Sequence, residues 1–170
     1  AIILYSFFLF FSKPKPFFQI SGETLLGRNI RQLSSVFKFD EIFILIGHRH
    51  KQIDEAVKRY RCETKITTIK LPRDKVSGGL IEGYSLIDRY IERDERFISV
   101  LGDEYFGGLD HEDFADFIHE SDATVVCALK RYADPIDYFK NYSVNFDKDT
   151  KILTKFEEKP EKITSRYYGL

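Results

Sequence analysis

The sequence contains no methionine, no tryptophan and only two cysteines among its 170 residues. Cys62 and Cys127 lie far apart, and neither forms a Cys-x-x-Cys spacing with the other or with a histidine. This pattern favours neither a zinc site nor a disulfide framework, and it suits a protein of the reducing cytoplasm. Because no methionine begins the chain, we also expect its start to be trimmed or altered.

An excess of charge of either sign is also lacking. The 26 Lys and Arg residues are balanced by 27 Asp and Glu residues, which leaves a net charge of -1. Proteins that mainly bind nucleic acid usually carry a basic excess, so this balance gives no electrostatic case for a nucleic-acid partner.

Long hydrophobic runs are absent as well. The most apolar stretch, Ala1 to Phe11, is too short to span a bilayer. No basic residue precedes it and no small-residue cleavage site follows it, which is unlike an export signal. The sequence therefore predicts no membrane partner, and we interpret the stretch as a buried first strand that runs into an aromatic loop.

The chain does contain a regular alternation of apolar runs and amphipathic stretches. Strands are expected at 1–5, 41–46, 64–71, 96–100 and 122–129, and helices at 23–37, 52–60, 77–91 and 111–119. This order predicts an α/β fold, in which a three-layer, doubly wound, mostly parallel sheet carries helices on both faces.

The pattern changes after about Asp134. Alternating residues at 142–147 and 151–157 predict a small β-hairpin around a turn at 147–150. The length suits a single domain, 1–170. Residues 167–170 read as the beginning of a strand that the chain does not finish, so we expect a truncated C-terminus.

Asp103 is the first candidate for a functional residue. It follows the strand at 96–100, and ligands of open α/β sheets bind at the carboxyl edge of the strands. A carboxylate beside bound phosphates is what Mg²⁺ prefers, so Asp103 is a candidate ligand for a hard divalent cation. Spacing alone allows a simpler interpretation, in which Gly102 and Asp103 only form a turn after the strand.

The histidines indicate solvated positions. His48 and His50 form an isolated i, i+2 pair after a strand, which is more typical of a loop than of a metal site. His111 and His119 lie on a helix rich in acidic residues, and that charge run predicts a solvated face.

Six segments occur in order along the chain: Ala1-Ile2-Ile3-Leu4, Lys13-Pro14-Lys15-Pro16, residues 40–48, Ser77-Gly78-Gly79-Leu80, Leu101-Gly102-Asp103 and Glu158-Lys159-Pro160. Together they resemble the sugar-1-phosphate nucleotidyltransferases, which join an NTP to a sugar 1-phosphate and release pyrophosphate. The resemblance covers nearly the whole chain and corresponds to the amino-terminal two thirds of a family member. It implies a fold of the nucleotide-diphospho-sugar transferase type, and an Mg²⁺-dependent enzyme able to form a homo-oligomer.

The resemblance also implies roles for individual residues. Lys15 would contact the phosphates and Asp103 would hold Mg²⁺. Nucleotide-binding residues would be Ser77, Gly78, Gly79 and Gly102, and sugar-phosphate-binding residues would be Tyr142, Ser143, Glu158 and Lys159. Taken singly, each has a simpler reading, such as a solvated lysine at Lys15 or a charged strand end at Glu158.

The sequence departs from the family at several places, one of which is Glu104 where Asn is common. The Gly-rich loop with an arginine that follows the family's first strand is replaced by residues 5–12, which contain neither glycine nor arginine. Lys75-Val76 stands where Gly-Thr is usual, and the chain stops before the second metal-binding acid. A non-catalytic regulatory or binding subunit, or a phosphocholine cytidylyltransferase-type enzyme, therefore stays an alternative. The choice of base and sugar is left open.

Overall fold

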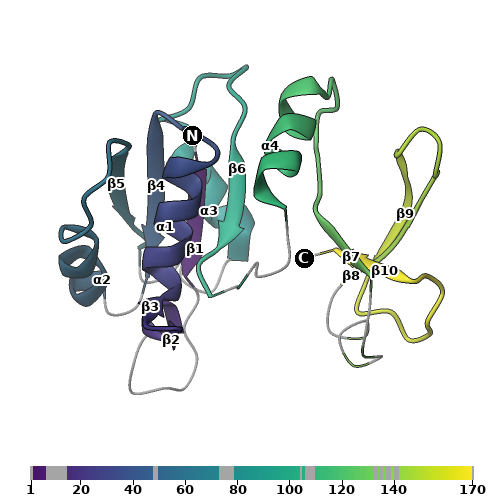
Figure 1. The fold of residues 1–170 in the computed structure, drawn as a ribbon, viewed down its shortest axis with the longest axis horizontal. Coiled ribbons are helices and arrows are strands. Elements are labelled where there is room, and N and C mark those ends of the chain that lie inside the picture. The colour runs from purple at the N-terminus through teal and green to yellow at the C-terminus, as the bar shows by residue number, and fades with distance from the viewer. Residues whose placement is uncertain are drawn as a thin grey trace. The chain divides into compact units, whose positions relative to one another are not determined.

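The computed structural model describes residues 2–6, 15–47, 50–72, 79–103, 105, 110–131, 134, 136, 139 and 142–169. The chain folds into two compact units, Ala1–Ala115 and Asp116–Leu170 (Figure 1). Among the described residues, no helix combines the length and the apolar character needed to cross a bilayer.

The first unit is built on a four-stranded parallel sheet with the order β5-β4-β1-β6 (Figure 1). Its strands are β1 (Ile2–Ser6), β4 (Glu41–Ile46), β5 (Lys65–Lys70) and β6 (Ile98–Leu101). β4 pairs with β1 on one side and with β5 on the other, and all of its residues after Glu41 are buried. A strand covered on both faces needs such a continuous apolar run. The predicted parallel α/β sheet is therefore confirmed.

Helices cover both faces of this sheet. They are α1 (Leu25–Ser35), α2 (His50–Val57) and α3 (Gly79–Ile87). A fourth helix, α4 (His111–Glu120), begins in the first unit and ends in the second. Ile42, Ile44 and Ile46 of β4 join a core cluster with residues of α1 and α2. The alternate residues Phe43 and Leu45 join a second cluster that contains Ile87 of α3. Because successive side chains of a strand point to opposite faces, these two clusters show the three layers predicted from the sequence.

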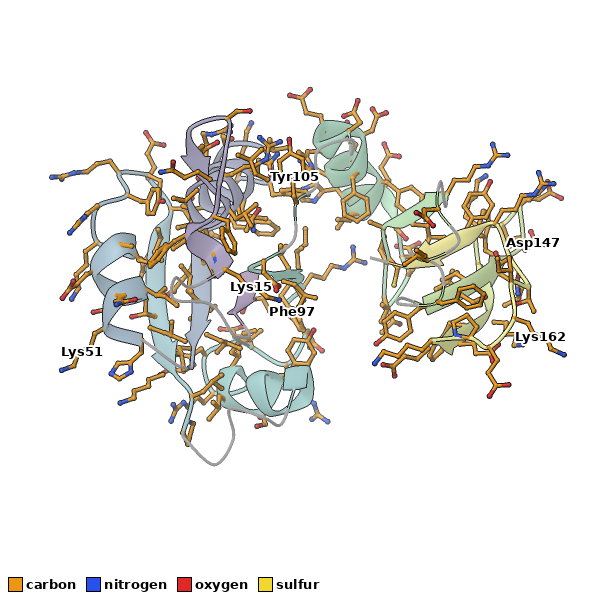
Figure 2. The ribbon with its side chains drawn as sticks, turned by 90° about the horizontal axis from the view of Figure 1, so that it is seen from below. Lys15, Lys51, Phe97, Tyr105, Asp147 and Lys162 are labelled. Atoms are coloured by element: carbon orange, nitrogen blue, oxygen red, sulfur yellow. The ribbon has the colours of Figure 1, made fainter. Side chains whose placement is uncertain are left out.

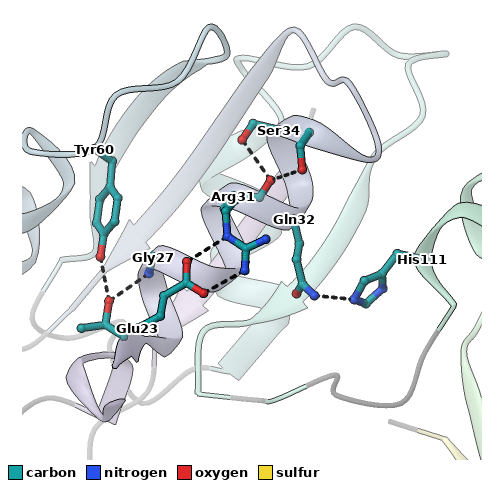
Figure 3. Close-up of polar contacts among 9 residues, drawn as sticks. Glu23, Gly27, Arg31, Gln32, Ser34, Tyr60 and His111 are labelled. Atoms are coloured by element: carbon teal, nitrogen blue, oxygen red, sulfur yellow. Dashed lines mark hydrogen bonds and ion pairs between the residues drawn. The ribbon is translucent and has the colours of Figure 1, made fainter. Parts of the chain in front are cut away.

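The entrance to α1 is fixed by polar contacts (Figure 3). Short strands β2 (Gln19–Ile20) and β3 (Glu23–Thr24) precede the helix, which begins two residues later than predicted. The Thr24 hydroxyl caps the helix by accepting the N–H of Gly27 at 3.1 Å, and it shares a 2.7 Å hydrogen bond with the Tyr60 hydroxyl. Arg31 donates two hydrogen bonds to the Glu23 carboxylate, at 2.9 and 2.8 Å. The predicted helix is confirmed with a shorter span.

The second unit carries an antiparallel sheet with the order β7-β10-β8-β9 (Figure 1). Its strands are β7 (Leu129–Arg131), β8 (Tyr142–Phe146), β9 (Leu153–Glu158) and β10 (Tyr167–Gly169). The Asp147 carboxylate closes the turn between β8 and β9 by accepting the N–H groups of Asp149 and Thr150 at 3.0 and 2.8 Å. The predicted hairpin is confirmed.

The strand predicted at 122–129 is wrong. Residues 122–128 form no strand, and Leu129 alone of the predicted segment enters β7, which pairs antiparallel with β10. The side chain of Val125 is 71% exposed. A run of β-branched residues supplies propensity, but a strand forms only where a neighbouring strand and a packing surface complete it.

Candidate functional site

Lys15 and Asp103 are brought together although 88 residues separate them in the chain. The Lys15 Nζ donates to the Asp103 Oδ2 at 2.7 Å. Asp103 follows β6 through the buried Gly102, so it lies beyond the carboxyl end of a strand of the parallel sheet. Figure 2 marks Lys15, together with Tyr105, the second residue after Asp103.

The backbone around Lys15 is held by local hydrogen bonds. Lys15 begins a 3₁₀ turn, η1 (Lys15–Phe17), that buries Pro16. The N–H of Phe18 donates to the Lys15 carbonyl at 2.9 Å, and the N–H of Leu25 donates to the Phe18 carbonyl at 3.0 Å. The turn is thus tied to the first residue of α1, and this attachment fixes the position from which the lysine reaches the sheet edge.

The two side chains of this ion pair are only partly exposed. The Asp103 side chain is 19% exposed and that of Lys15 is 37% exposed. The lysine compensates the charge of the carboxylate, and solvent reaches both side chains. The Asp103 Oδ1 receives no hydrogen bond from the described residues, so it can face a metal ion. Mg²⁺ is commonly held by one or two carboxylates together with substrate phosphates, and a single aspartate is compatible with that mode.

Arg28 is a cation near this edge that the sequence did not single out. Its guanidinium lies 4.6 Å from the centre of the Tyr105 ring, and its buried Nε has no hydrogen-bond partner among the described residues. In the sequence, an isolated arginine on an amphipathic helix cannot be told from an ordinary solvent-exposed residue. No pattern in the sequence marks it, because the contact depends on a residue far along the chain.

The prediction of a solvated face is wrong for His111. Its ring is half-buried, with Nε2 2.6 Å from the Gln32 Nε2 (Figure 3). The Phe37 ring lies 6.4 Å away, centre to centre. Burial lowers the pKa of His111, and the positive charge of Arg28 lowers it further. The acidic residues of this helix suggested a solvated face, and nothing in the sequence indicated that His111 contacts Gln32. His119 is exposed, as predicted.

The residues expected to bind nucleotide are described only in part. Gly79 is the first residue of α3, and Gly102 is buried in the turn after β6. Ser77 and Gly78 lie outside the described residues, as does His48. His50 is half-buried at the start of α2, rather than in the loop that the sequence predicts.

Of the four residues expected to bind the sugar phosphate, three lie on neighbouring strands of the second unit, and Lys159 follows the end of β9. Tyr142 and Glu158 are direct cross-strand partners in β8 and β9, and Ser143 is buried beside Tyr142. Lys159 follows Glu158, with its Nζ 3.7 Å from the Glu158 Oε1. Its φ of +46° is a left-handed conformation that is strained for a residue other than glycine, and the following Pro160 restricts it further. Such strain occurs where the surrounding structure holds a residue in one orientation.

Comparisons with known proteins relate the chain to one family and to solved structures. A family model described as "Nucleotidyl transferase" matches residues 9–169. The comparison with curated proteins finds no match. HddC from Yersinia pseudotuberculosis, in a complex with GMP-PN, is 22% identical with a TM-score of 0.66, over 99% of this chain and 75% of that chain.

A second solved structure is the inositol-1-phosphate CTP transferase from T. maritima. It is 16% identical with a TM-score of 0.68, over 99% of this chain and 66% of that chain. At these identities the likeness establishes the fold. The fold is therefore of the nucleotide-diphospho-sugar transferase type, as the sequence predicts. The chain spans about two thirds to three quarters of the length of these two proteins.

Proposed function

The chain belongs to the nucleotidyl transferase family, and from that premise we propose that it transfers a nucleotidyl group from an NTP to a sugar 1-phosphate with Mg²⁺. The observation that carries the proposal is the Lys15–Asp103 pair beyond the carboxyl end of β6. Support also comes from the two solved structures, one named as a complex with GMP-PN and the other as a CTP transferase acting on inositol 1-phosphate.

The reaction explains why a lysine and an aspartate are needed. An oxygen of the sugar phosphate attacks the α-phosphorus of the NTP, the bond from that phosphorus to the β-phosphate oxygen breaks, and pyrophosphate leaves with the electron pair. Negative charge accumulates on the phosphates, and fixed cations stabilise it. The Lys15 ammonium would contact a phosphate oxygen, and Asp103 would hold Mg²⁺. The bound ion would neutralise phosphate charge and align the reacting groups.

The second unit would bind the acceptor. The Glu158 carboxylate is exposed next to Tyr142 and can accept hydrogen bonds from sugar hydroxyls. Lys159 is exposed, and its ammonium can pair with the phosphate of the sugar 1-phosphate. Ser143, whose side chain is buried, would contribute its backbone.

The nucleotide would be bound by Ser77, Gly78, Gly79 and Gly102. Gly79 begins α3, where free backbone N–H groups favour an anion or a base carbonyl. Gly102 precedes Asp103 in a buried turn, so the backbone there can approach the ligand closely.

A second candidate function is favoured by the sequence of residues 5–12. Without glycine or arginine, this segment lacks the groups that wrap a triphosphate in the family that the chain resembles. A non-catalytic regulatory or binding subunit with the same fold would not need them. It would form a stable complex with an intact relative.

Pyrophosphate release from a panel of NTPs and sugar 1-phosphates tests the proposal. We expect Mg²⁺-dependent turnover by the wild type and its loss in Asp103→Asn, which keeps the size of the side chain but removes its charge. Asp94→Asn is the matched control, because Asp94 is an exposed aspartate of the same unit and belongs to none of the proposed sites. Its turnover should equal that of the wild type.

The outcomes separate the two candidate functions. Turnover that survives in Asp103→Asn would reject the metal assignment. A folded wild type that releases no pyrophosphate with any pair of substrates, and that binds an intact relative, would support the non-catalytic subunit.

A further inference from the structure

The second unit contains an open pocket of about 670 Å³. Tyr142, Ser143, Glu158 and Lys159 are not among its lining residues. Small-molecule sites have volumes of roughly 300–1,000 Å³, so this pocket has the capacity for a ligand of nucleotide size.

The charged residues known to line the pocket have one sign. Three basic side chains line it, Arg131, Lys148 and Arg166, and none of the lining residues that the structure describes is acidic. Within the described part of the chain, none of the three forms an ion pair or a hydrogen bond through its side chain. An anion would therefore find uncompensated positive charge here. Two of the cations are arginines, whose planar guanidinium matches the oxygens of a phosphate.

An aromatic wall lies beside these cations. The rings of Phe146 and Tyr167 meet edge to face, with centroids 5.0 Å apart. Tyr167 is the cross-strand partner of Arg131 in the pairing of β10 with β7, so a cation and a ring lie side by side on one face of the sheet. A ring of a ligand can pack against such aromatic side chains while its phosphates meet the arginines.

The wall formed by residues 163–167 is fixed to the sheet. The Ser165 hydroxyl donates to the Val144 carbonyl and accepts the N–H of Tyr167 at 3.1 Å. The Thr164 hydroxyl lies 3.3 Å from that of Ser143. These contacts shape the pocket before a ligand arrives, which lowers the entropic cost of binding.

We propose that this pocket binds a phosphorylated small molecule that carries a planar ring, with its phosphate at Arg131, Lys148 and Arg166 and its ring against Phe146 and Tyr167. This site shares no residue with the Lys15–Asp103 pair. It needs no catalytic step, so it does not depend on the proposed function.

Protection of single arginines from phenylglyoxal, followed by mass spectrometry on the full chain, tests this proposal locally. ATP is the probe, and inorganic pyrophosphate is the comparison without a ring. We expect ATP to slow the modification of Arg131 and Arg166 saturably, and to do so at lower concentration than pyrophosphate. Arg93, an exposed arginine of the first unit, is the internal control and should react at an unchanged rate.

Variants separate this site from other phosphate sites. Lys148→Gln should raise the ATP concentration for half-maximal protection of Arg166 roughly tenfold, as expected for the loss of one charge-assisted hydrogen bond. Phe146→Leu should remove the preference for ATP over pyrophosphate. Lys155→Gln, a basic residue of β9 outside the pocket lining, should leave protection unchanged, and so should Lys15→Met.

Two results would overturn the proposal. One is modification of Arg131 and Arg166 at the same rate with and without saturating ATP. The other is protection that falls equally in Lys155→Gln and Lys148→Gln, because that would indicate diffuse attraction to surface charge. Protection that persists in Lys15→Met while pyrophosphate release is lost would show two independent phosphate sites.

Discussion

At the scale of single residues, we expect the Lys15–Asp103 ion pair to affect turnover strongly and the free energy of unfolding only slightly. The Lys15 side chain is 37% exposed, so solvent screens the ion pair with Asp103. The free energy of unfolding should therefore change by less than about 1 kcal/mol in Lys15→Met. Turnover should fall roughly 10²-fold or more, because a cation facing the developing charge is removed. Urea unfolding and pyrophosphate release measured on the same preparation check both statements.

The opposite pattern would contradict this reading of Lys15. A variant that loses several kcal/mol of stability, and whose turnover per folded molecule equals that of the wild type, would make Lys15 a structural residue.

His111 predicts a pH dependence of stability with a definite sign. Its pKa is lowered from the ordinary 6.5 by burial and by Arg28, so the folded chain binds fewer protons at this ring than the unfolded chain does. This contribution is fully present above the ordinary pKa and is lost as the pH falls below it. Between about pH 7 and about pH 5, the urea midpoint should fall more steeply in the wild type than in His111→Gln. Equal slopes for the two proteins would contradict the assignment.

At the scale of elements, the start of α1 depends on one side chain. Thr24 supplies the cap and also contacts Tyr60. Thr24→Ala should therefore lower the free energy of unfolding by about 1–2 kcal/mol. Thr24→Ser keeps the hydroxyl and should recover most of the loss. Ser35→Ala, at the exposed end of the same helix, is the control and should change stability by less than about 0.5 kcal/mol. A thermal or urea denaturation series measures all three, and equal effects of Thr24→Ala and Ser35→Ala would refute the cap.

The strands also show which features of the fold can be predicted from the sequence. β4 was predicted with its observed bounds, because an unbroken apolar run has one stable place in a three-layer fold. The strand predicted at 122–129 failed because propensity does not reveal whether a pairing partner exists. The predicted hairpin is observed, because its turn residues and alternation are local signals.

The candidate site likewise contains residues that can be predicted from the sequence and residues that cannot. Asp103 could be singled out from a strand end followed by glycine and an acid, and the family resemblance added Lys15. The contact between Arg28 and Tyr105, and the burial of His111, depend on residues distant in sequence and could not be predicted from local pattern.

At the scale of the whole molecule, the two units differ in their apolar cores. The core clusters lie in the first unit, whereas Val144 and Pro160 are the buried apolar side chains among the described residues of the second. Small antiparallel sheets with little buried apolar surface are marginally stable. Backbone amides of β8 and β9 should therefore exchange with solvent much faster than those of β4. Hydrogen exchange followed by mass spectrometry measures this difference, and equal protection of β4 and β8 would contradict it.

We propose that Asp103, held by Lys15, is the metal ligand of a nucleotidyl-transfer site. Electron paramagnetic resonance with Mn²⁺ in place of Mg²⁺ tests it directly, with each NTP present in turn. In the presence of NTP, the wild type should bind Mn²⁺ with roughly tenfold or higher affinity than Asp103→Asn does. Loss of a residue that only orients a metal ligand already lowers metal affinity by about this factor. Equal Mn²⁺ affinity of the wild type and Asp103→Asn, with every NTP, would contradict the account.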